Sequence, residues 1–244
     1  MRKVSMFAVT AFAICVTARG QGRLSVSSST APRGDKWETV VIKVTDVSDV
    51  PVTGLVIESV CSPRSGAGRV NRVRHWDDPL LVSRKGLTTA IQPGGTSEYQ
   101  LGGAPAPFDA YQCAGSVAAA LFADGVNIGD ARMIARVQET RAVVAREIKW
   151  YIPVLTEALE KGTGRADLLY TLDEHRDSAK GSAHDGDEQI GVMDAHNSVA
   201  FNLLNMRLLG GDPLPDSERL KIILSILTDW QQRLSAQLPA GSQP

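Results

Sequence analysis

The sequence predicts an α+β protein in which an N-terminal antiparallel β-sandwich of immunoglobulin-like type is followed by a C-terminal helical bundle. Up to about residue 128, short apolar and β-branched runs alternate with polar residues and are separated by Gly, Pro, Ser and Asp. Beyond that point, apolar residues recur at steps of three and four, which is typical of helices with one buried face. We therefore expect the sandwich over residues 23–128, the bundle over 130–238 and a disordered tail over 239–244.

The first eighteen residues, 1–18, have the pattern of a secretory signal peptide. The basic pair Arg2-Lys3 precedes an apolar run, and the tripeptide Val-Thr-Ala that ends at position 18 offers a peptidase site. Because the run is shorter than the roughly 20 residues that span a bilayer, we expect no membrane span. A lipid anchor at Cys15 is not expected either, since Ile14 stands where a lipoprotein signal has a small residue. The predicted location is extracytoplasmic, either periplasmic or secreted.

Composition and net charge limit the classes of partner that this chain is expected to bind. The chain has 244 residues, of which 43% are hydrophobic and 22% charged, as in an ordinary soluble globular protein. Without Arg2 and Lys3 it carries about 24 basic and 27 acidic side chains, so its net charge is only slightly negative. Such a balance argues against a nucleic-acid partner or a dedicated membrane surface, and we expect a protein partner.

The clearest strand of the first half is WETVVIKVTD, which places Val40, Ile42 and Val44 on one face at period two. A turn follows at Pro51, because proline lacks the N–H that a sheet ladder needs. The run LVIESV, residues 55–60, is then expected to be the next strand.

Two further strands complete the predicted sandwich. One lies near Tyr99–Leu101, and the other runs from Tyr111 to Phe122. The dipeptide Asp124-Gly125 after the second of these is a strong hairpin signal. Short strands with turns about every ten residues fit two antiparallel sheets.

Cys61 and Cys113 are the two cysteines that remain after the signal peptide. In an oxidising compartment such a pair forms a disulfide if the strand ending at Cys61 lies antiparallel to the strand beginning near Cys113. The bond would close a loop of about 50 residues and stabilise the fold by on the order of 4 kcal/mol. Two buried thiols are the alternative. Tyr111, two residues before Cys113, is similar to the tyrosine corner of an immunoglobulin domain.

Four helices are expected in the second half. The first begins after Asp130 and carries one apolar face that Arg141 interrupts, with a kink near Pro153. The second covers about 165–178 and is followed by a flexible charged loop, AKGSAHDGDE. The remaining pair consists of a helix over about 187–209 and a helix with the apolar stripe Leu220, Ile223, Leu227, Trp230 and Leu234.

Histidines and carboxylates of the second and third helices form one candidate site. His175 and His196 lie beside the apolar stripes, so they are expected to approach each other across the bundle. Imidazole and carboxylate groups are metal ligands, but no His-Glu-x-x-His motif is present. The simpler interpretation is that the two histidines lie beside the apolar core and form hydrogen bonds with other side chains. The nearby acidic residues and the remaining histidine of the cluster are Asp173, Glu174, His184, Asp185, Asp187, Glu188 and Asp194.

A second candidate is the basic segment RSGAGRVNRVRHW. Arg72, Arg74 and Trp76 share one face of an extended segment, where they would attract an acidic partner or stack on a sugar or base. A solvated strand edge protected by arginines is the alternative. No phosphate loop, nucleophile elbow or other catalytic signature is found, so we expect no cofactor and name no catalytic residue.

Two stretches, VTDVSDVPVTGLVIE and ALFADGVNIGDARMIARVQETR, resemble uncharacterised secreted proteins of soil bacteria. In those proteins an immunoglobulin-like sandwich precedes a helical region. The resemblance implies the same fold here, and it transfers no functional residue because both stretches are structural.

These observations predict a secreted or periplasmic, non-enzymatic module that binds or scaffolds another protein. One alternative is an enzyme or a metal- or ligand-binding protein that uses the histidine and carboxylate cluster of the helical part. A further alternative is a carbohydrate-binding sandwich that uses Trp37 or Trp76, which requires an exposed ring.

Overall fold

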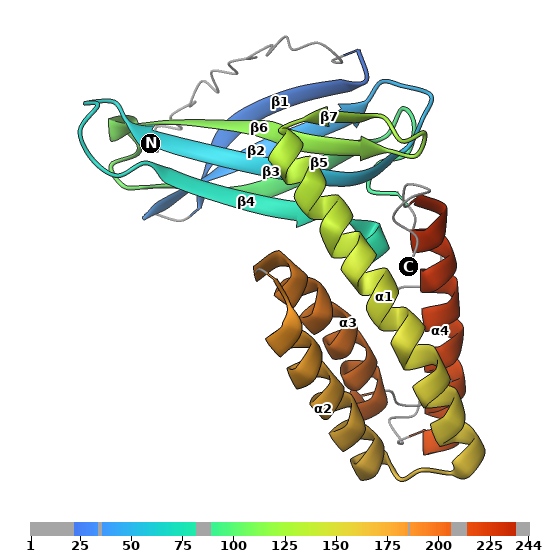
Figure 1. Ribbon diagram of the computed structural model, residues 1–244. Coiled ribbons are helices and arrows are strands. Elements are labelled where there is room, and N and C mark those ends of the chain that lie inside the picture. The colour runs from blue at the N-terminus through green and yellow to red at the C-terminus, as the bar shows by residue number, and fades with distance from the viewer. Residues whose placement is uncertain (1–21, 34–35, 82–88, 185, 206–213, 238–244) are drawn as a thin grey trace, which may run out of the picture. The chain divides into compact units, whose positions relative to one another are not determined.

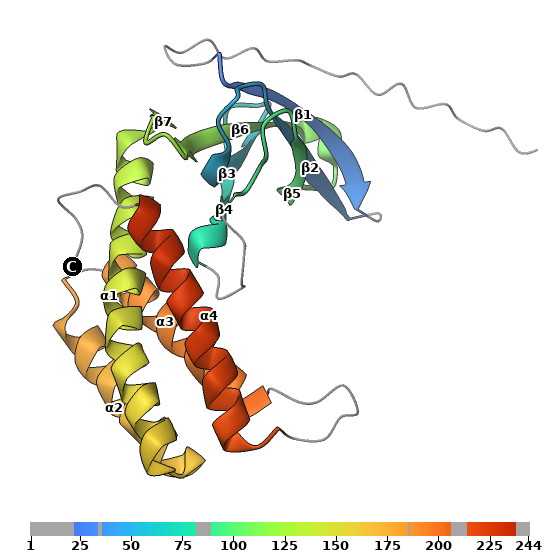
Figure 2. The same ribbon diagram turned by 90° about the vertical axis from the view of Figure 1, so that its right-hand side faces the viewer.

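The computed structural model describes residues 22–33, 36–81, 89–184, 186–205 and 214–237. Within these ranges the chain is a mixed α+β protein with two antiparallel sheets followed by four helices (Figures 1 and 2). In this described part, no helix is long and apolar enough to cross a membrane.

The predicted signal peptide with Cys15 and the predicted tail 239–244 lie outside the described residues.

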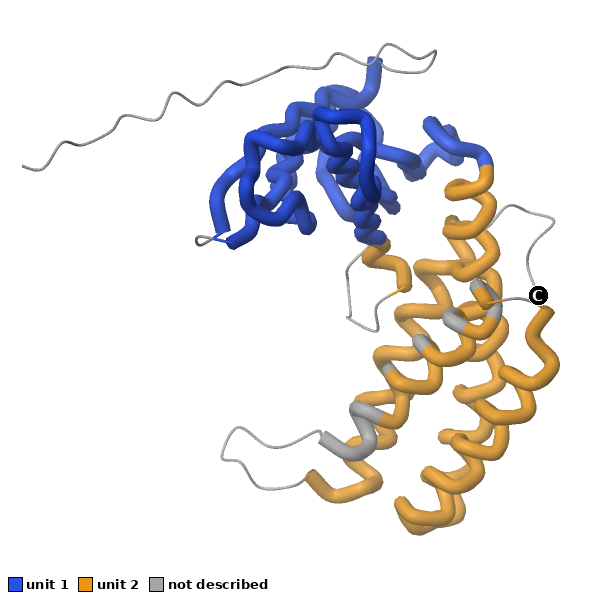
Figure 3. Tube along the Cα trace, turned by 90° about the vertical axis from the view of Figure 1, so that its left-hand side faces the viewer, with its two compact units in different colours: residues 1–77, 90–131 blue, residues 78–89, 132–244 orange. Residues whose placement is uncertain are grey.

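The chain divides into two compact units, shown in two colours in Figure 3. Residues 1–77 and 90–131 form the first, which we call the β unit. Residues 78–89 and 132–244 form the second, which we call the helical unit. The chain therefore leaves the β unit between two of its strands, contributes a short segment to the helical unit, and returns.

In the described residues of the β unit, seven strands form the two sheets. The first sheet has the order β1-β2-β5 and the second the order β4-β3-β6-β7. The strands are β1 (Leu24–Arg33), β2 (Trp37–Asp46), β3 (Val52–Pro63), β4 (Asn71–Asp77), β5 (Thr96–Pro105), β6 (Tyr111–Phe122) and β7 (Asn127–Gly129). Short 3₁₀ helices, η1 (Pro79–Leu81) and η2 (Phe108–Ala110), lie between strands.

The predicted alternation along β2 is confirmed. Val40, Ile42 and Val44 are fully buried, whereas Lys43 between them is exposed and its ammonium lies 3.3 Å from a carboxylate oxygen of Glu98 on β5. Both sheets contribute side chains to one hydrophobic core. From β2 come the three aliphatic residues just named, and the partners from the other sheet include Leu55, Ile57, Ala120 and Phe122.

β6 spans the residues expected from the sequence, and β7 returns along it after the Asp124-Gly125 turn. Gly125 has φ +81°, a conformation that residues with a Cβ rarely adopt, so this position favours glycine. β3 and β5 extend beyond the short strands predicted near 55–60 and 99–101.

The helices are α1 (Ala131–Lys161), α2 (Arg165–Ser182), α3 (Gly186–Asn205) and α4 (Asp216–Gln237). α1 begins directly after Asp130 and continues through Pro153. The predicted stripe of α4 is confirmed, because all five of its apolar residues are buried in the core of the helical unit.

The charged segment AKGSAHDGDE was expected to be a flexible loop, and that prediction is wrong for most of its length. α2 continues to Ser182 and α3 starts at Gly186, so only residues 183–185 separate the two helices. The hydroxyl of Ser182 donates to the carbonyl of Ser178 one turn earlier, at 3.0 Å. Lysine and alanine are strong helix formers, and their propensity outweighs that of the single Gly181.

η1 belongs to the helical unit although it follows β4 in the sequence. Leu80 is fully buried in the helical core, and its carbonyl accepts a hydrogen bond from the indole N–H of Trp230 on α4. Next to it, Nε and Nη2 of Arg141 donate to the two carboxylate oxygens of Asp78 at 2.8 and 3.1 Å. Arg141 interrupts the apolar face of α1 because its charge is paired inside the core.

Candidate functional site

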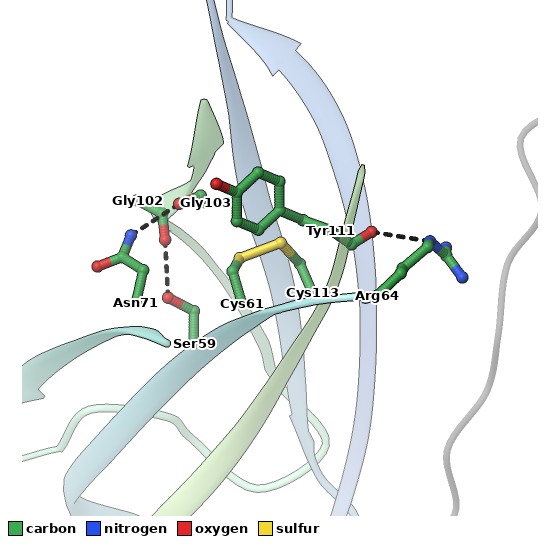
Figure 4. The surroundings of a disulfide bond; sticks show 8 residues. All are labelled: Ser59, Cys61, Arg64, Asn71, Gly102, Gly103, Tyr111 and Cys113. Atoms are coloured by element: carbon green, nitrogen blue, oxygen red, sulfur yellow. Dashed lines mark hydrogen bonds between the residues drawn. A yellow bond between two sulfur atoms is a disulfide. The ribbon is translucent and has the colours of Figure 1, made fainter. Parts of the chain in front are cut away.

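Cys61 on β3 and Cys113 on β6 lie directly opposite each other in the strand register and form the predicted disulfide (Figure 4). Cys61 is 1% exposed and belongs to the hydrophobic core of the β unit. The bond joins the two central strands of the four-stranded sheet.

Two hydrogen bonds near the disulfide tie the second sheet to β5 of the first (Figure 4). The Ser59 hydroxyl donates to the carbonyl of Gly102 at 2.9 Å, and the Asn71 amide donates to the carbonyl of Gly103 at 2.8 Å. Gly103 is buried, so the bond from Asn71 also satisfies a carbonyl that has little access to water. The two sheets are thus joined by polar links as well as by their shared core.

A cleft of about 490 Å³ lies beside the disulfide. Its volume falls within the range of about 300–1,000 Å³ that is usual for ligand sites. The cleft is lined by two runs of consecutive residues, Ser28–Thr30 of β1 and Tyr111–Ala114 of β6, together with Glu38, Arg64, Phe108 and Asp109.

The runs of consecutive lining residues indicate whether the cleft meets a face of the sheet or the edge of a strand. Successive side chains of a strand point to opposite faces of its sheet, so a surface that touches only one face meets every second residue. Here three residues in a row on β1 and four in a row on β6 line the cleft. We conclude that the cleft meets the edges of both strands, where backbone N–H and C=O groups lie.

Within the described residues, neither of these edges is fully paired. β1 pairs with β2 only, and β6 pairs on its outer side with β7 only, over Ala119–Leu121. From Tyr111 to Val117, β6 pairs with β3 on its inner side and with no described strand on the other. Edges of this kind are templates for an added strand.

Arg64, which lines this cleft, is held by two hydrogen bonds. Its backbone N–H donates to the carbonyl of Ala110 at 2.8 Å, and its side-chain Nε donates to the carbonyl of Tyr111 at 3.1 Å (Figure 4). In the described part of the chain, its two terminal nitrogens have no hydrogen-bond or ion-pair partner. Because the guanidinium is held in place at Nε, its two terminal nitrogens can donate hydrogen bonds to an acceptor group of a ligand.

The remaining polar groups of the cleft carry the opposite charge. The carboxylates of Glu38 and Asp109 line it, and neither forms an ion pair with a described residue. Phe108 and Tyr111 add aromatic surface, and Trp37, which is adjacent to Glu38 in the sequence, is 53% exposed. The cleft therefore mixes both charges with aromatic rings and the hydroxyls of β1.

The tyrosine corner expected at Tyr111 is not visible as a hydrogen bond. Among the described residues the Tyr111 hydroxyl has no partner; the backbone of Tyr111 is bonded instead, since its N–H donates to the carbonyl of Phe108 and its oxygen accepts from Arg64. Tyr111 contributes to the cleft and to the core instead.

Arg72, Arg74 and Trp76 lie on β4, which is an edge strand of the second sheet, and none of them lines the cleft. Nε of Arg74 donates to Glu58 of β3 at 2.6 Å, and Nε of Arg72 lies 3.7 Å from the same carboxylate. This cross-strand pairing agrees with the interpretation of an edge that arginines keep solvated.

His175 and His196 enter one polar cluster of the helical unit, but they bind different carboxylates. Nε2 of His175 lies 2.8 Å from Oε2 of Glu147, whose side chain is only 3% exposed. The imidazole of His175 also stacks on Trp150 at a centroid distance of 3.5 Å. Nε2 of His196 lies 3.2 Å from a carboxylate oxygen of Asp173.

Burial affects the pKa of the second histidine. It lowers the pKa of His196 below its ordinary value, and the nearby Arg176 guanidinium lowers this pKa further. In the described part of the chain, the Nδ1 atom of His196 and the hydroxyl of Tyr151 are buried without a hydrogen-bond partner. Burial, together with the charge of Glu147, raises the pKa of Tyr151.

Across the described residues, no group of three or more His, Cys, Asp and Glu side chains is arranged to hold a metal ion. Asp173 is held by Arg176 at 2.7 Å, and Glu174 accepts a hydrogen bond from the hydroxyl of Tyr170. The other carboxylates that the sequence placed near this cluster have no described side chain: Asp185, Asp187, Glu188 and Asp194.

The cleft beside the disulfide was not anticipated from the sequence. A signal was present in β1, LSVSSSTAPR, where hydroxyl residues replace the apolar residues of a regular core strand. A strand of this composition is typical of a solvated edge. The sequence contains no comparable indication that the edge of β6 lies next to it.

Comparisons with known proteins add no function. No protein-family model and no curated protein matches the chain. Similar solved structures include that of the putative ApaA protein from Bordetella pertussis, which is 18% identical, covers 43% of this chain and 82% of its own, and has a TM-score of 0.31. The Northeast Structural Genomics Consortium target SoR45 is 12% identical, covers 43% of this chain and 77% of its own, and has a TM-score of 0.28.

Proposed function

We propose that this chain is an extracytoplasmic, non-enzymatic binding module that holds a segment of a partner protein in the cleft beside the Cys61–Cys113 disulfide. The observation that carries the proposal is the lining of the cleft by consecutive residues of β1 and β6. Such a lining presents backbone donors and acceptors at two strand edges.

The proposal includes an immunoglobulin-like sandwich as the scaffold of the site. It is supported by the common core of the two sheets and by the polar links from Ser59 and Asn71 to β5. In a sandwich of two antiparallel sheets, the open edges lie along the sides, where a partner segment has access.

The proposed extracytoplasmic location has two supports. The pattern of residues 1–18 is that of a signal peptide, and the disulfide is a bond that persists in oxidising compartments. A fusion of residues 1–30 to a reporter enzyme that is active only outside the cytoplasm tests it. An inactive reporter would contradict the location.

Peptide selection tests the binding function. Random decapeptides are selected on the oxidised protein from a display library, and the tightest binder is synthesised and titrated by calorimetry. We expect Gln112→Trp, which places an indole in the cleft, to weaken binding at least about tenfold. Gln100→Trp, at an exposed position of β5 that does not line the cleft, is the matched control and should bind like the wild type.

Two outcomes would overturn the proposed function. One is that no selected peptide binds saturably. The other is that Gln112→Trp, folded as judged by circular dichroism, binds as tightly as Gln100→Trp. Ser29→Trp enters the same cleft from β1 and serves as a second variant if Gln112→Trp does not fold.

A carbohydrate is the second candidate ligand because Trp37 is 53% exposed and therefore available for stacking. Phe108 and Tyr111 supply further aromatic surface in the cleft. Binding to a glycan array that Trp37→Ala abolishes and Trp76→Ala preserves would favour this candidate over a protein partner.

The alternative of a metal site or enzyme in the helical unit rests on His175 and His196. Each of them already binds a carboxylate, Glu147 and Asp173 respectively. Elemental analysis of the purified protein tests this alternative. Stoichiometric metal that is lost in the variant H175A/H196A would support it.

A further inference from the structure

We infer that the cleft recognises its partner segment by two opposite charges: a carboxylate of the segment binds Arg64, and a basic group of the same segment binds Glu38 and Asp109. This inference rests on the proposed function, because it names the chemistry by which the occupant of the same cleft is recognised. The occupant is a polypeptide segment that carries both charges. Its carboxylate is the chain terminus or the side chain of an aspartate or glutamate, and these two sources share one chemistry.

Arg64 supplies an oriented site for the carboxylate. It directly follows β3, its backbone N–H donates to the carbonyl of Ala110 at 2.8 Å, and its Nε donates to the carbonyl of Tyr111 at 3.1 Å (Figure 4). The bond from Nε uses one of the five N–H donors of the guanidinium, so the four donors of the terminal nitrogens remain. Such a planar fork matches the two oxygens of a carboxylate.

The three charged groups of the cleft do not neutralise one another. In the part of the chain that the structure describes, none of Arg64, Glu38 and Asp109 takes part in an ion pair. They also come from different elements, since Glu38 lies on β2 and Asp109 on η2. Charges of both signs that line a cleft without protein counter-charges complement a ligand that brings one charge of each sign.

The position of Glu38 is set by an irregularity in the first sheet. Trp37 pairs with Pro105 and Thr39 pairs with Gly102, so the register of β2 against β5 shifts at Glu38. Irregularities of this kind redirect side chains and are frequent next to functional sites. The backbones are close here, because a Cβ on Gly103 would lie 2.4 Å from the carbonyl oxygen of Glu38. The tight strand packing therefore fixes the backbone that carries this carboxylate.

Neutral polar groups complete the lining. Among the described residues, the side chains of Ser28, Ser29, Thr30 and Gln112 have no hydrogen-bond partner. Hydroxyl and amide groups donate and accept hydrogen bonds, so they suit the N–H and C=O groups that a polypeptide presents between its charged groups. Phe108 adds apolar contact surface. The charges thus select the segment, and the neutral groups bind the chain between them.

Neutralising one charge of a peptide at a time tests the carboxylate. The decapeptide selected on the cleft is resynthesised with a carboxyl-terminal amide, and separately with each aspartate or glutamate replaced by its amide. We expect one of these neutral peptides to bind the wild type at least about tenfold more weakly than the parent, because a hydrogen bond to a charged group is lost. Loss on amidation identifies the chain terminus as the source, and loss on side-chain replacement identifies an acidic residue.

A double-mutant cycle assigns that carboxylate to Arg64. Arg64→Gln should bind the parent and the neutral peptide within about threefold of each other, because the group that distinguishes them is gone. Arg69→Gln removes an exposed arginine of the same connection between β3 and β4 that does not line the cleft, so it is the matched control and should keep the tenfold difference. A tenfold difference that persists in Arg64→Gln would overturn the assignment.

The basic group is tested in the same way. Each lysine or arginine of the peptide is replaced by glutamine, and its amino terminus is acetylated. We expect one of these changes to weaken binding to the wild type at least about tenfold and to have no such effect on the double variant Glu38→Gln with Asp109→Asn. Glu98→Gln with Asp49→Asn removes two exposed carboxylates of the β unit outside the cleft and is the control.

Failure of this inference can be told apart from failure of the proposed function. A peptide that binds in the cleft, as shown by loss in Gln112→Trp, but tolerates every neutralisation within about threefold would overturn charge recognition and leave the binding module standing. This peptide series uses the wild type, so it is decisive even if Arg64→Gln does not fold. If no peptide binds, or if glycans bind through Trp37, the proposed protein-binding function itself is wrong.

Discussion

Arg141 of α1 binds both carboxylate oxygens of Asp78, and the two side chains are only 3% and 4% exposed. Asp78 precedes η1, the short segment that the chain contributes to the helical unit between β4 and β5. The ion pair therefore joins residues that are 63 positions apart inside one core.

Removal of one partner should strongly destabilise the helical unit. Asp78→Ala removes the carboxylate that faces the buried Arg141 charge, and we expect a loss of about 3–5 kcal/mol in the free energy of unfolding. The matched control is Glu98→Ala, which removes the exposed partner of Lys43 and should cost about 0–1 kcal/mol. Urea titrations of both variants measure the difference. If both variants lost the same free energy of unfolding, the expectation that the buried pair contributes more than the exposed pair would be wrong.

Removal of the disulfide should destabilise the β unit, because the unfolded chain gains conformational entropy when the cross-link is lost. The double variant C61A/C113A frees a loop of about 50 residues, and the chain-entropy account gives a loss on the order of 4 kcal/mol. Chemical denaturation with and without a reductant measures it. The reductant should destabilise the wild type by a similar amount and leave the double variant unchanged. A wild type insensitive to complete reduction would contradict the expectation.

Gly115 should tolerate no side chain, because β6 and β2 approach closely there. A Cβ at this position would lie 2.2 Å from Cγ1 of Ile42. We expect Gly115→Ala to cost about 1–3 kcal/mol through overpacking. Gly181 of α2 has open space around its Cβ position, so Gly181→Ala should be neutral or stabilise by up to about 1 kcal/mol. Thermal melts of the two variants compare them.

The buried His196 should make the protein less stable in mild acid. Its folded pKa lies below the unfolded value of about 6.5, so the unfolded chain binds the proton more readily. Stability is therefore full above the unfolded pKa and is lost as the pH falls through it toward the folded pKa. His196→Gln should reduce the slope of unfolding free energy against pH between about 7 and 5. His184→Gln, at an exposed position, is the control, and an unchanged slope in His196→Gln would refute this.

The half-buried Tyr99 and the buried Tyr151 should respond differently to loss of the hydroxyl. Tyr99 donates to Asp77 at 2.5 Å, so Tyr99→Phe should cost about 1 kcal/mol. The Tyr151 hydroxyl has no partner among the described residues, so Tyr151→Phe should be neutral or stabilising by up to about 2 kcal/mol. Guanidinium titrations measure both. Clear destabilisation by Tyr151→Phe would reveal a partner such as an internal water.

The periodic part of the fold was accessible from the sequence. The alternation at Val40, Ile42 and Val44 predicted β2, and the spacing of apolar residues predicted the buried face of α4. The disulfide followed from two cysteines on strands expected to be neighbours. The periodic features depend only on residues close together in the sequence, and the disulfide depends only on the pairing of two strands, so the sequence was enough to predict them.

Other features required contacts between residues far apart. Arg141 breaks an apolar stripe in the sequence, and only the position of Asp78 explains why a charge stands there. The histidines were expected to approach each other, and they do enter one polar cluster, but only the tertiary structure shows that each binds its own carboxylate, Glu147 for His175 and Asp173 for His196.

The candidate site depends most on tertiary structure. Sequence periodicity determines which side chains of a strand face the core, because that property repeats along the strand itself. It does not determine which edges remain unpaired or lie next to each other, since this depends on the order of strands in two sheets. The cleft between β1 and β6 is such a product of strand order.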